Sequence, residues 1–512
     1  MPATVMTKRT QPRRSPRLVT LALFTLFAAW SIASGQPAAA DDVRPLNVVF
    51  ILADDLGWGE LGCYGQQKIP TPHIDQLARE GVRFTQFYSG APVCAPSRCV
   101  LMTGLHTGHA EIRGNQQASV TRPEFPEGQH PLSEKALTLP KVFQQAGYVT
   151  GAFGKWGLGP VGSSGDPNRQ GFDEFFGYNC QAVAHSYFPS HLWHNSEHVQ
   201  INKQAVAGHK PAVAGQVNVE DNLGEVYAPQ LMIAAAEKFV DANRDRPFFL
   251  YLPFIEPHVA MHPPLESMNR FPPEWDTEVY RGDSGYLAHP RPHAAYAAMI
   301  ADLDSYVGRI MHALEVAQLK DRTLVIFTSD NGTTHEAGKE ARFHVGGADP
   351  QFFNSTQGLR GFKGSVHEGG IRVPMIARLP GHISANKVNQ TPGYFADWFP
   401  TLCHAVGLKV PADLDGEDLW PTITTEQPMN HRRPMIWVFP EYGGQVALRI
   451  GDFKVLRKGL KTKNPSNWEV YDLSQDPGET RDLAPSQASL VEQAKEILRE
   501  QVSDNATFPL SW

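Results

Sequence analysis

Continuous apolar runs separated by helical patterns constrain the fold of this chain most strongly. The runs lie at residues 47–52, 148–153, 248–254, 323–328 and, in a shorter form, 374–377. Such runs, rich in β-branched residues, are typical of strands buried on both faces of a parallel sheet. Helical patterns lie between them, at residues 73–80, 139–146, 229–243 and 294–315. The alternation predicts an α/β sandwich with a mainly parallel central sheet.

The pattern changes after about residue 430. Short apolar segments separated by turns, typical of antiparallel strands, lie at residues 435–439, 445–450, 453–456 and 469–473. A helix is expected at residues 486–502. We therefore predict a catalytic domain at residues 41–430 and a small C-terminal α+β subdomain with an antiparallel sheet at residues 431–512.

The first forty residues have the pattern of a secretory signal peptide. Basic residues between positions 8 and 17 precede an apolar run at 18–32, and Ala38 and Ala40 form an A-x-A cleavage signal. We predict cleavage after Ala40, a secreted or periplasmic protein, and no stable membrane insertion afterwards. An uncleaved membrane anchor is the alternative, because the apolar run approaches the ~18 residues of a marginal span.

The overall charge limits the partners of the protein. The formal net charge is −7 at pH 7, which gives no general attraction to nucleic acid. We therefore expect no nucleic-acid partner. An anionic substrate would have to meet a local cluster of cationic side chains instead.

Residues 94–104 read Cys-Ala-Pro-Ser-Arg-Cys-Val-Leu-Met-Thr-Gly. This segment resembles the Cys-x-Pro-Ser-Arg motif, with Thr-Gly five residues on, of the type I, formylglycine-dependent sulfatases. The resemblance extends from residues 53–55 to residues 471–473 and implies the α/β/α fold of the alkaline-phosphatase-like superfamily. It also implies that a maturase oxidises Cys94 to formylglycine. For a lone cysteine in a secreted protein, half of a disulfide would be the alternative.

A hydrated aldehyde at position 94 suits the hydrolysis of a sulfate monoester. One of its two hydroxyls attacks sulfur, and the other later expels sulfate from the sulfo-enzyme intermediate, so that a difficult reaction is divided into two easier steps. Cys94 also precedes an expected helix at residues 97–102, whose N-terminal N–H groups favour an anion.

Acidic residues follow two of the predicted strands. Asp54 and Asp55 come after the first apolar run, and Asp330 and Asn331 come after the run at 323–328. Because ligands bind beyond the carboxyl ends of such strands, these side chains can converge on one cation. An all-oxygen set favours Ca²⁺ or Mg²⁺ over zinc. The resemblance favours one Ca²⁺, bound also by the formylglycine oxygen at Cys94.

Cationic residues must reverse the charge of this acidic cluster. Three carboxylates outweigh one divalent cation by a single charge, which would repel a sulfate ester. Arg98, Lys155 and Lys363 are the candidates for sulfate binding. The resemblance assigns them this role, and it assigns protonation of the leaving oxygen to His258, with Lys363 as its partner. An imidazole suits general acid catalysis because its pKa lies near neutrality.

One position departs from the family pattern. Many members read Gly-Lys-Trp-His-Leu-Gly, where the histidine contacts the formylglycine hydroxyl, whereas this chain has Gly157 at that place. We predict that His185, in the next loop, supplies the missing base.

The substrate is expected to be a sulfated carbohydrate, and aryl sulfates are expected to be turned over as surrogates. Histidines and aromatic residues between 178 and 193 suit stacking on a sugar face, although packing beneath a long loop would explain them as well. Galactose and N-acetylgalactosamine sulfate esters are favoured. Two alternatives stay open: a phosphomonoester or phosphonate hydrolase of the same fold, and a non-catalytic protein that binds sulfated glycans.

Overall fold

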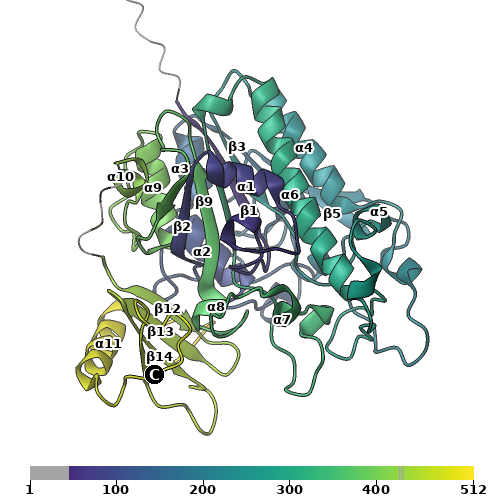
Figure 1. The fold of residues 1–512 in the computed structure, drawn as a ribbon. Helices are drawn as coiled ribbons and strands as arrows, with labels where there is room; N and C mark the ends of the chain where they lie inside the picture. Colours follow the sequence, from purple (N-terminus) through teal and green to yellow (C-terminus); the bar gives the residue numbers. More distant parts are fainter. Residues whose placement is uncertain (1–44, 426, 428, 430–431) are drawn as a thin grey trace, which may run out of the picture. The chain divides into compact units, whose positions relative to one another are not determined.

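The computed structural model describes residues 45–425, 427, 429 and 432–512 (Figure 1). The predicted signal peptide at residues 1–40 lies outside the described residues. Residues 45–512 form one compact unit. The division at about residue 430 stays a prediction. Within the described part of the chain, no helix has the length and apolar character needed to cross a membrane.

Eleven strands of the described residues form the central sheet. Ten of them follow the order β10-β2-β9-β8-β1-β7-β3-β4-β5-β6, and β11 pairs with β2. Their bounds are β1 Asn47–Ala53, β2 Val82–Tyr88, β3 Val149–Lys155, β4 Glu174–Tyr178, β5 His191–His194, β6 Glu197–Gln200, β7 Phe248–Pro253, β8 Thr323–Ser329, β9 Arg372–Arg378, β10 Lys387–Asn389 and β11 Gly393–Tyr394. The predicted mainly parallel sheet is confirmed, since β8, β1, β7, β3 and β4 pair in parallel.

Helices cover both faces of this sheet, as the alternation predicts. Along β1, Val49 and Ile51 pack in one apolar cluster with α1, α4 and α6, whereas Val48, Phe50 and Leu52 pack in another with α2, α3 and α9. Successive side chains of a strand point to opposite faces, so a continuous apolar run fills two cores at once. The helices are α1 Pro72–Arg79, α2 Cys94–Thr103, α3 Leu139–Gln145, α4 Ala228–Ala242, α5 Leu265–Met268, α6 Pro292–Val316, α7 Pro350–Phe353, α8 Glu368–Ile371, α9 Trp398–Ala405 and α10 Trp420–Thr425.

The C-terminal segment forms a second sheet, as predicted. β12 Met435–Phe439, β13 Gln445–Ile450, β14 Phe453–Lys458 and β15 Glu469–Asp472 pair antiparallel in sequence order, and α11 Ala488–Gln501 follows. One face of this sheet packs against α11. The other face joins the apolar cluster that contains α2 and α9, and the Trp437 indole donates a hydrogen bond to the Ser89 carbonyl. This sheet is therefore anchored on the core beside α2.

Candidate functional site

The register of the central strands brings the predicted acidic residues together. β1 pairs with β8 in parallel, with Ala53 opposite Ser329, so residues 54–55 and 330–331 leave the same edge side by side. β7 flanks β1 on its other side, with Leu52 opposite Pro253. The loop after β7, which carries His258, therefore begins at this edge too. Polar residues cluster here because the apolar strands end here.

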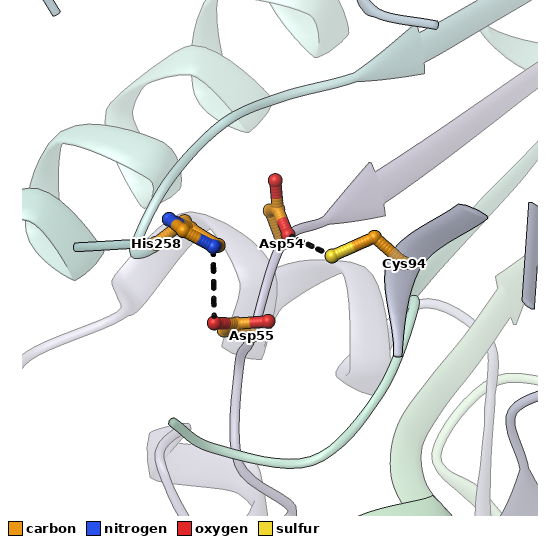
Figure 2. A group of neighbouring side chains, drawn as sticks. All are labelled: Asp54, Asp55, Cys94 and His258. Carbon is orange, nitrogen blue, oxygen red and sulfur yellow. Dashed lines mark hydrogen bonds and ion pairs between the residues drawn. The ribbon is translucent and has the colours of Figure 1, made fainter. Parts of the chain in front are cut away.

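Cys94 contacts the first of these acidic residues (Figure 2). It is buried at the first residue of α2, and its Sγ donates a hydrogen bond of 3.4 Å to Asp54 Oδ1. The other oxygen of Asp54 lies 2.5 Å from Lys155 Nζ and 3.5 Å from a terminal nitrogen of Arg98. Burial raises the pKa of Asp54, but the positive charges of Lys155 and Arg98 outweigh this effect and hold the pKa well below its usual value. Asp54 therefore stays ionised.

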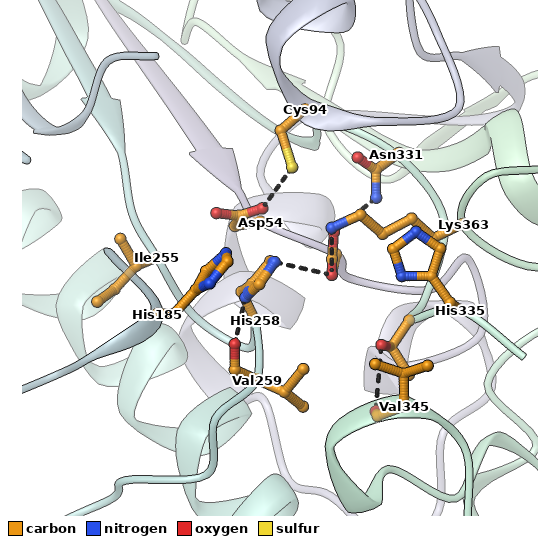
Figure 3. A network of polar contacts seen from close by, with 12 residues as sticks. Asp54, Cys94, His185, Ile255, His258, Val259, Asn331, His335, Val345 and Lys363 are labelled. Carbon is orange, nitrogen blue, oxygen red and sulfur yellow. Dashed lines mark hydrogen bonds and ion pairs between the residues drawn. The ribbon is translucent and has the colours of Figure 1, made fainter. Parts of the chain in front are cut away.

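Asp55, labelled in Figure 2, is the second centre of the network, and Figure 3 shows its partners Lys363, Asn331 and His258. Lys363 Nζ lies 2.8 Å and 2.9 Å from its two oxygens, and Asn331 Nδ2 donates a hydrogen bond of 2.7 Å to Oδ1. His258 Nε2 lies 3.6 Å from Oδ2. Although burial opposes a buried charge, Asp55 and Cys94 raise the pKa of Lys363 well above its usual value. Lys363 thus carries its proton at neutral pH.

Arg98 joins the two halves of the site. Its Nε and one terminal nitrogen lie 3.0 Å and 2.8 Å from Asp330 Oδ2, and its other terminal nitrogen donates to the Lys155 carbonyl. Asp330 Oδ1 accepts the backbone N–H of Asp55 at 3.2 Å. Burial and the charge of Asp54 raise the pKa of Asp330 to about 6 in spite of Arg98. The crowded carboxylates therefore repel one another, and a cation would relieve that repulsion.

The donors at this edge fit a hard cation. Asn331 Oδ1 is buried and has no hydrogen-bond partner, an uncommon state for a buried amide oxygen. The side-chain donor atoms of Asp54, Asp55, Cys94 and His258 all lie within 4.8 Å of one another, close enough to surround one ion. Carboxylate and amide oxygens predominate among the predicted ligands, as Ca²⁺ and Mg²⁺ prefer. Asp330 differs from the expected arrangement, because it is not part of this group of donor atoms; its oxygens accept hydrogen bonds from Arg98 and from the backbone N–H of Asp55.

His258 is oriented by the backbone. Its Nδ1 donates to the Val259 carbonyl, so the proton of the neutral ring is on Nδ1 and Nε2 faces Asp55. Burial and the charge of Lys363 lower the pKa of His258 well below its usual value. The imidazole is therefore neutral beside the carboxylates, and negative charge brought in by a substrate would raise its pKa.

His185 lies next to His258. The two rings are stacked, with centroids 4.9 Å apart and planes within 7°, and His185 Nδ1 lies 2.8 Å from His209 Nε2. Burial and the positive charges of Lys155 and Lys363 lower the pKa of His185 well below its usual value. A neutral imidazole beside the cluster is able to accept a proton.

The space beside Gly157 is filled by another side chain. A Cβ at this position would lie 2.7 Å from Gln181 Nε2, and the φ of 78° disfavours other residues. The Nε2 of Gln181 and the Nδ2 of Asn179 are both buried without a hydrogen-bond partner. Sequence reasoning missed these two amides, because nothing in their spacing indicates that they lie beside Gly157.

The aromatic residues of the loop at 178–193 divide into two groups. Tyr178, Tyr187 and Phe188 are buried in the core, which is the packing alternative. His191 and Trp193 are partly buried on β5 and contact Glu127, with hydrogen-bond distances of 3.0 Å and 2.9 Å. The prediction that the loop's aromatic rings stack on a sugar is therefore wrong for Tyr187 and Phe188.

Known proteins match this chain over most of its length. The family model described as Sulfatase matches residues 46–408, and that of N-sulphoglucosamine sulphohydrolase, C-terminal, matches residues 362–505. Arylsulfatase A of Homo sapiens is 31% identical, over 89% of this chain and 87% of its own length. N-acetylgalactosamine-6-sulfatase of Rattus norvegicus is 32% identical, over 85% and 74%. The crystal structure of Ps i-CgsB in complex with k-i-k-neocarrahexaose has a TM-score of 0.71 and 26% identity, over 90% and 93%.

Proposed function

Because the chain belongs to the sulfatase family and is a sulfuric ester hydrolase, we propose that it cleaves sulfate monoesters with a formylglycine formed from Cys94 and one calcium ion. The observation that carries this proposal is the position of Cys94. Its Sγ lies at the start of α2, against Asp54, the carboxylate that also contacts Lys155 and Arg98. A maturase would have to convert the thiol to the aldehyde.

Formylglycine and calcium each have a specific role in this proposal. A formylglycine at position 94 would supply a nucleophilic hydroxyl and, on the same carbon, a second hydroxyl whose deprotonation releases sulfate. Calcium, when bound by Asp54, Asp55, Asp330, Asn331 and the oxygen at position 94, would draw negative charge from a sulfate oxygen.

The side chains of this protein perform the remaining tasks. The three carboxylates and one divalent cation leave a single negative charge, which is smaller than the positive charge of Arg98, Lys155 and Lys363 together. These three side chains therefore bind and orient the sulfo group. Lys363 and His258 both contact Oδ2 of Asp55 and would deliver a proton to the leaving oxygen. His185, neutral and stacked on His258, would accept the proton that is removed when sulfate is expelled.

The substrate is proposed to be a sulfated carbohydrate. The crystal structure of Ps i-CgsB holds a neocarrahexaose, and another similar structure holds D-glucosamine-2-N,6-O-disulfate. N-acetylgalactosamine-6-sulfatases are among the relatives that are about 30% identical to this chain. Galactose or N-acetylgalactosamine sulfate esters are the first substrates to examine, with aryl sulfates as surrogates. Secretion by the signal peptide at residues 1–40 is part of the same proposal.

An assay of ester and metal preference tests the proposed function. We expect protein isolated from its own host to release sulfate from 4-nitrophenyl sulfate and to lose this activity on chelation until calcium is restored. A zinc phosphatase would instead use several histidine ligands. Faster release of phosphate from 4-nitrophenyl phosphate, restored by zinc, would favour the phosphohydrolase alternative. Binding of sulfated glycans without hydrolysis would favour the non-catalytic alternative.

The role of His258 predicts a dependence on the leaving group. His258→Ala should lower kcat/KM by about 10²-fold or more for an alkyl or sugar sulfate, whose leaving oxygen needs a proton. The effect on 4-nitrophenyl sulfate should be much smaller, because nitrophenolate leaves without protonation. The measurement is a plot of kcat/KM against the pKa of the leaving alcohol for both proteins. Equal losses across the series would rule out proton donation by His258.

The role of His185 predicts a defect in the second half of the reaction. In His185→Ala, phenol release from an aryl sulfate should show a rapid burst followed by slow steady turnover, because sulfate expulsion lacks its base. The wild-type protein should show a smaller burst under the same conditions. Stopped-flow measurements across pH would check this, and a variant with unchanged turnover and pH profile would exclude His185.

A further inference from the structure

A polar cleft adjoins the proposed catalytic cluster. It has a volume of about 510 Å³ and is bounded by the loop at residues 360–367 and by the C-terminal subdomain. Lys363, which contacts Asp55, is one of its lining residues. The other side chains that carry the argument are His335, Arg360, Tyr442 and Lys458. A molecule held at Lys363 could therefore extend into this cleft.

An exposed aromatic ring forms one wall of the cleft. Tyr442 is 55% exposed, unusual for a large ring, and lies in the turn between β12 and β13 with a φ of 50°. Its hydroxyl donates a hydrogen bond of 2.6 Å to His335 Nε2, and the planes of the two rings are within 15° of each other. Gly364 lies against both rings, since a Cβ there would be 3.1 Å from His335 and 3.2 Å from Tyr442. The two rings are therefore stacked, with centroids 5.1 Å apart, and His335 holds the Tyr442 ring in place at the cleft.

Two cationic side chains line the same cleft. Arg360 Nη1 donates a hydrogen bond to the Tyr471 hydroxyl at 2.8 Å, and Lys458 Nζ donates one to His367 Nε2 at 2.7 Å. They share one carboxylate, Glu469, at 3.7 Å and 3.6 Å, and their side chains are 44% and 29% exposed. One carboxylate at such distances neutralises the two cations incompletely. Glu336, also in the lining, reduces the positive charge at the rim.

We propose that this cleft is a second sugar subsite, in which Tyr442, held in place by His335, lies against the ring of the saccharide next to the sulfated one, and Arg360 and Lys458 bind an anionic group on it. The group is a carboxylate or a sulfate, because both match a guanidinium and an ammonium. The natural substrate is then an oligosaccharide with an acidic neighbouring sugar. This inference rests on the proposed sulfatase function and adds the class of substrate.

The proposal is tested with three disaccharides that carry the same sulfated galactosamine. Their neighbouring sugar is neutral, a uronate or a second sulfated residue, and 4-nitrophenyl sulfate serves as the reference. In the wild-type protein, kcat/KM for at least one acidic disaccharide should exceed that for the neutral one by about tenfold or more, as expected for a charge-assisted contact. Comparison of kcat/KM for the uronate disaccharide with that for the doubly sulfated one identifies which anion is preferred.

Three variants separate the two parts of the subsite. Lys458→Met should bring the ratio of kcat/KM for the acidic disaccharide to kcat/KM for the neutral one close to one. Lys463→Met, which changes an exposed lysine outside the cleft, should leave this ratio unchanged. Tyr442→Asn should lower kcat/KM for all three disaccharides relative to the aryl sulfate. Asparagine is chosen because it tolerates the positive φ.

The outcomes distinguish this proposal from the proposed function. Normal turnover of the aryl sulfate without a preference for an acidic disaccharide would overturn the subsite and leave the sulfatase function intact. The same conclusion would follow if Lys458→Met kept the wild-type ratio. Absence of sulfate release from the aryl sulfate itself would instead contradict the proposed function.

Discussion

Replacement of Cys94 by alanine is expected to reduce sulfate ester turnover by about 10⁴-fold or more, because a methyl group lacks the thiol that is oxidised to the aldehyde, so the proposed nucleophile cannot form. Cys94 is buried at the start of α2, and its Sγ makes a hydrogen bond to Asp54. Steady-state kinetics with an aryl sulfate, on proteins prepared side by side from the native host, would measure the loss. The fold should persist, since alanine removes a single buried atom.

Cys99 provides the matched control for this substitution. It is a second buried cysteine of α2, and it lies outside the fixed positions of the Cys-x-Pro-Ser-Arg motif. Cys99→Ala should therefore lose some stability through a small cavity and keep most of its turnover. Activity in Cys94→Ala comparable to that of Cys99→Ala would contradict the proposed nucleophile.

Replacement of Asp54 by asparagine is expected to affect both catalysis and calcium binding. Asp54 contacts Cys94, Lys155 and Arg98. The variant therefore loses a proposed calcium ligand, which also holds the two sulfate-binding side chains in position. We expect kcat/KM to fall by about 10³-fold. We also expect a loss of about 3 kcal/mol of stability, because two buried cations lose a partner. Kinetics and urea unfolding measure the two effects.

The response to calcium separates metal binding from general destabilisation. When the free calcium concentration is a hundredfold its dissociation constant, binding of one ion should stabilise the wild-type protein by about 2.7 kcal/mol. Asp54→Asn should show little of this stabilisation. Asp304→Asn is the control, because Asp304 is a buried carboxylate of α6 that accepts the backbone N–H groups of His73 and Ile74, away from the cluster. Asp304→Asn should keep the calcium response. Equal calcium responses in wild-type protein and Asp54→Asn would argue against Asp54 as a ligand.

Much of the site could be predicted from the sequence because it follows the strands. A buried parallel strand is recognisable by its apolar run, and its carboxyl end must face the same edge as that of its neighbour. The pairing of β1 with β8 therefore brings Asp54 to Asp330, as their positions after two runs indicate. The expected helix at 97–102 is found as α2, which begins at Cys94.

Other features depend on tertiary contacts that no local pattern records. The run at 374–377 reads like its parallel neighbours, but β9 pairs antiparallel with β2 and β8. Gln181 fills the space beside Gly157, although the two are distant in sequence. Tyr442, in the turn between β12 and β13, lines the same cleft as Lys363, and Gln445 at the start of β13 donates a hydrogen bond of 2.7 Å to the carbonyl of Gly364. Such contacts follow from the packing of the two sheets.

Mass spectrometry of the peptide that contains residue 94, from active protein purified from its own host, tests the central claim most directly. The account predicts a side chain lighter than the thiol by the difference between CH2–SH and CHO, accompanied by the hydrate of the aldehyde. An unmodified Cys94 thiol in fully active protein would contradict it.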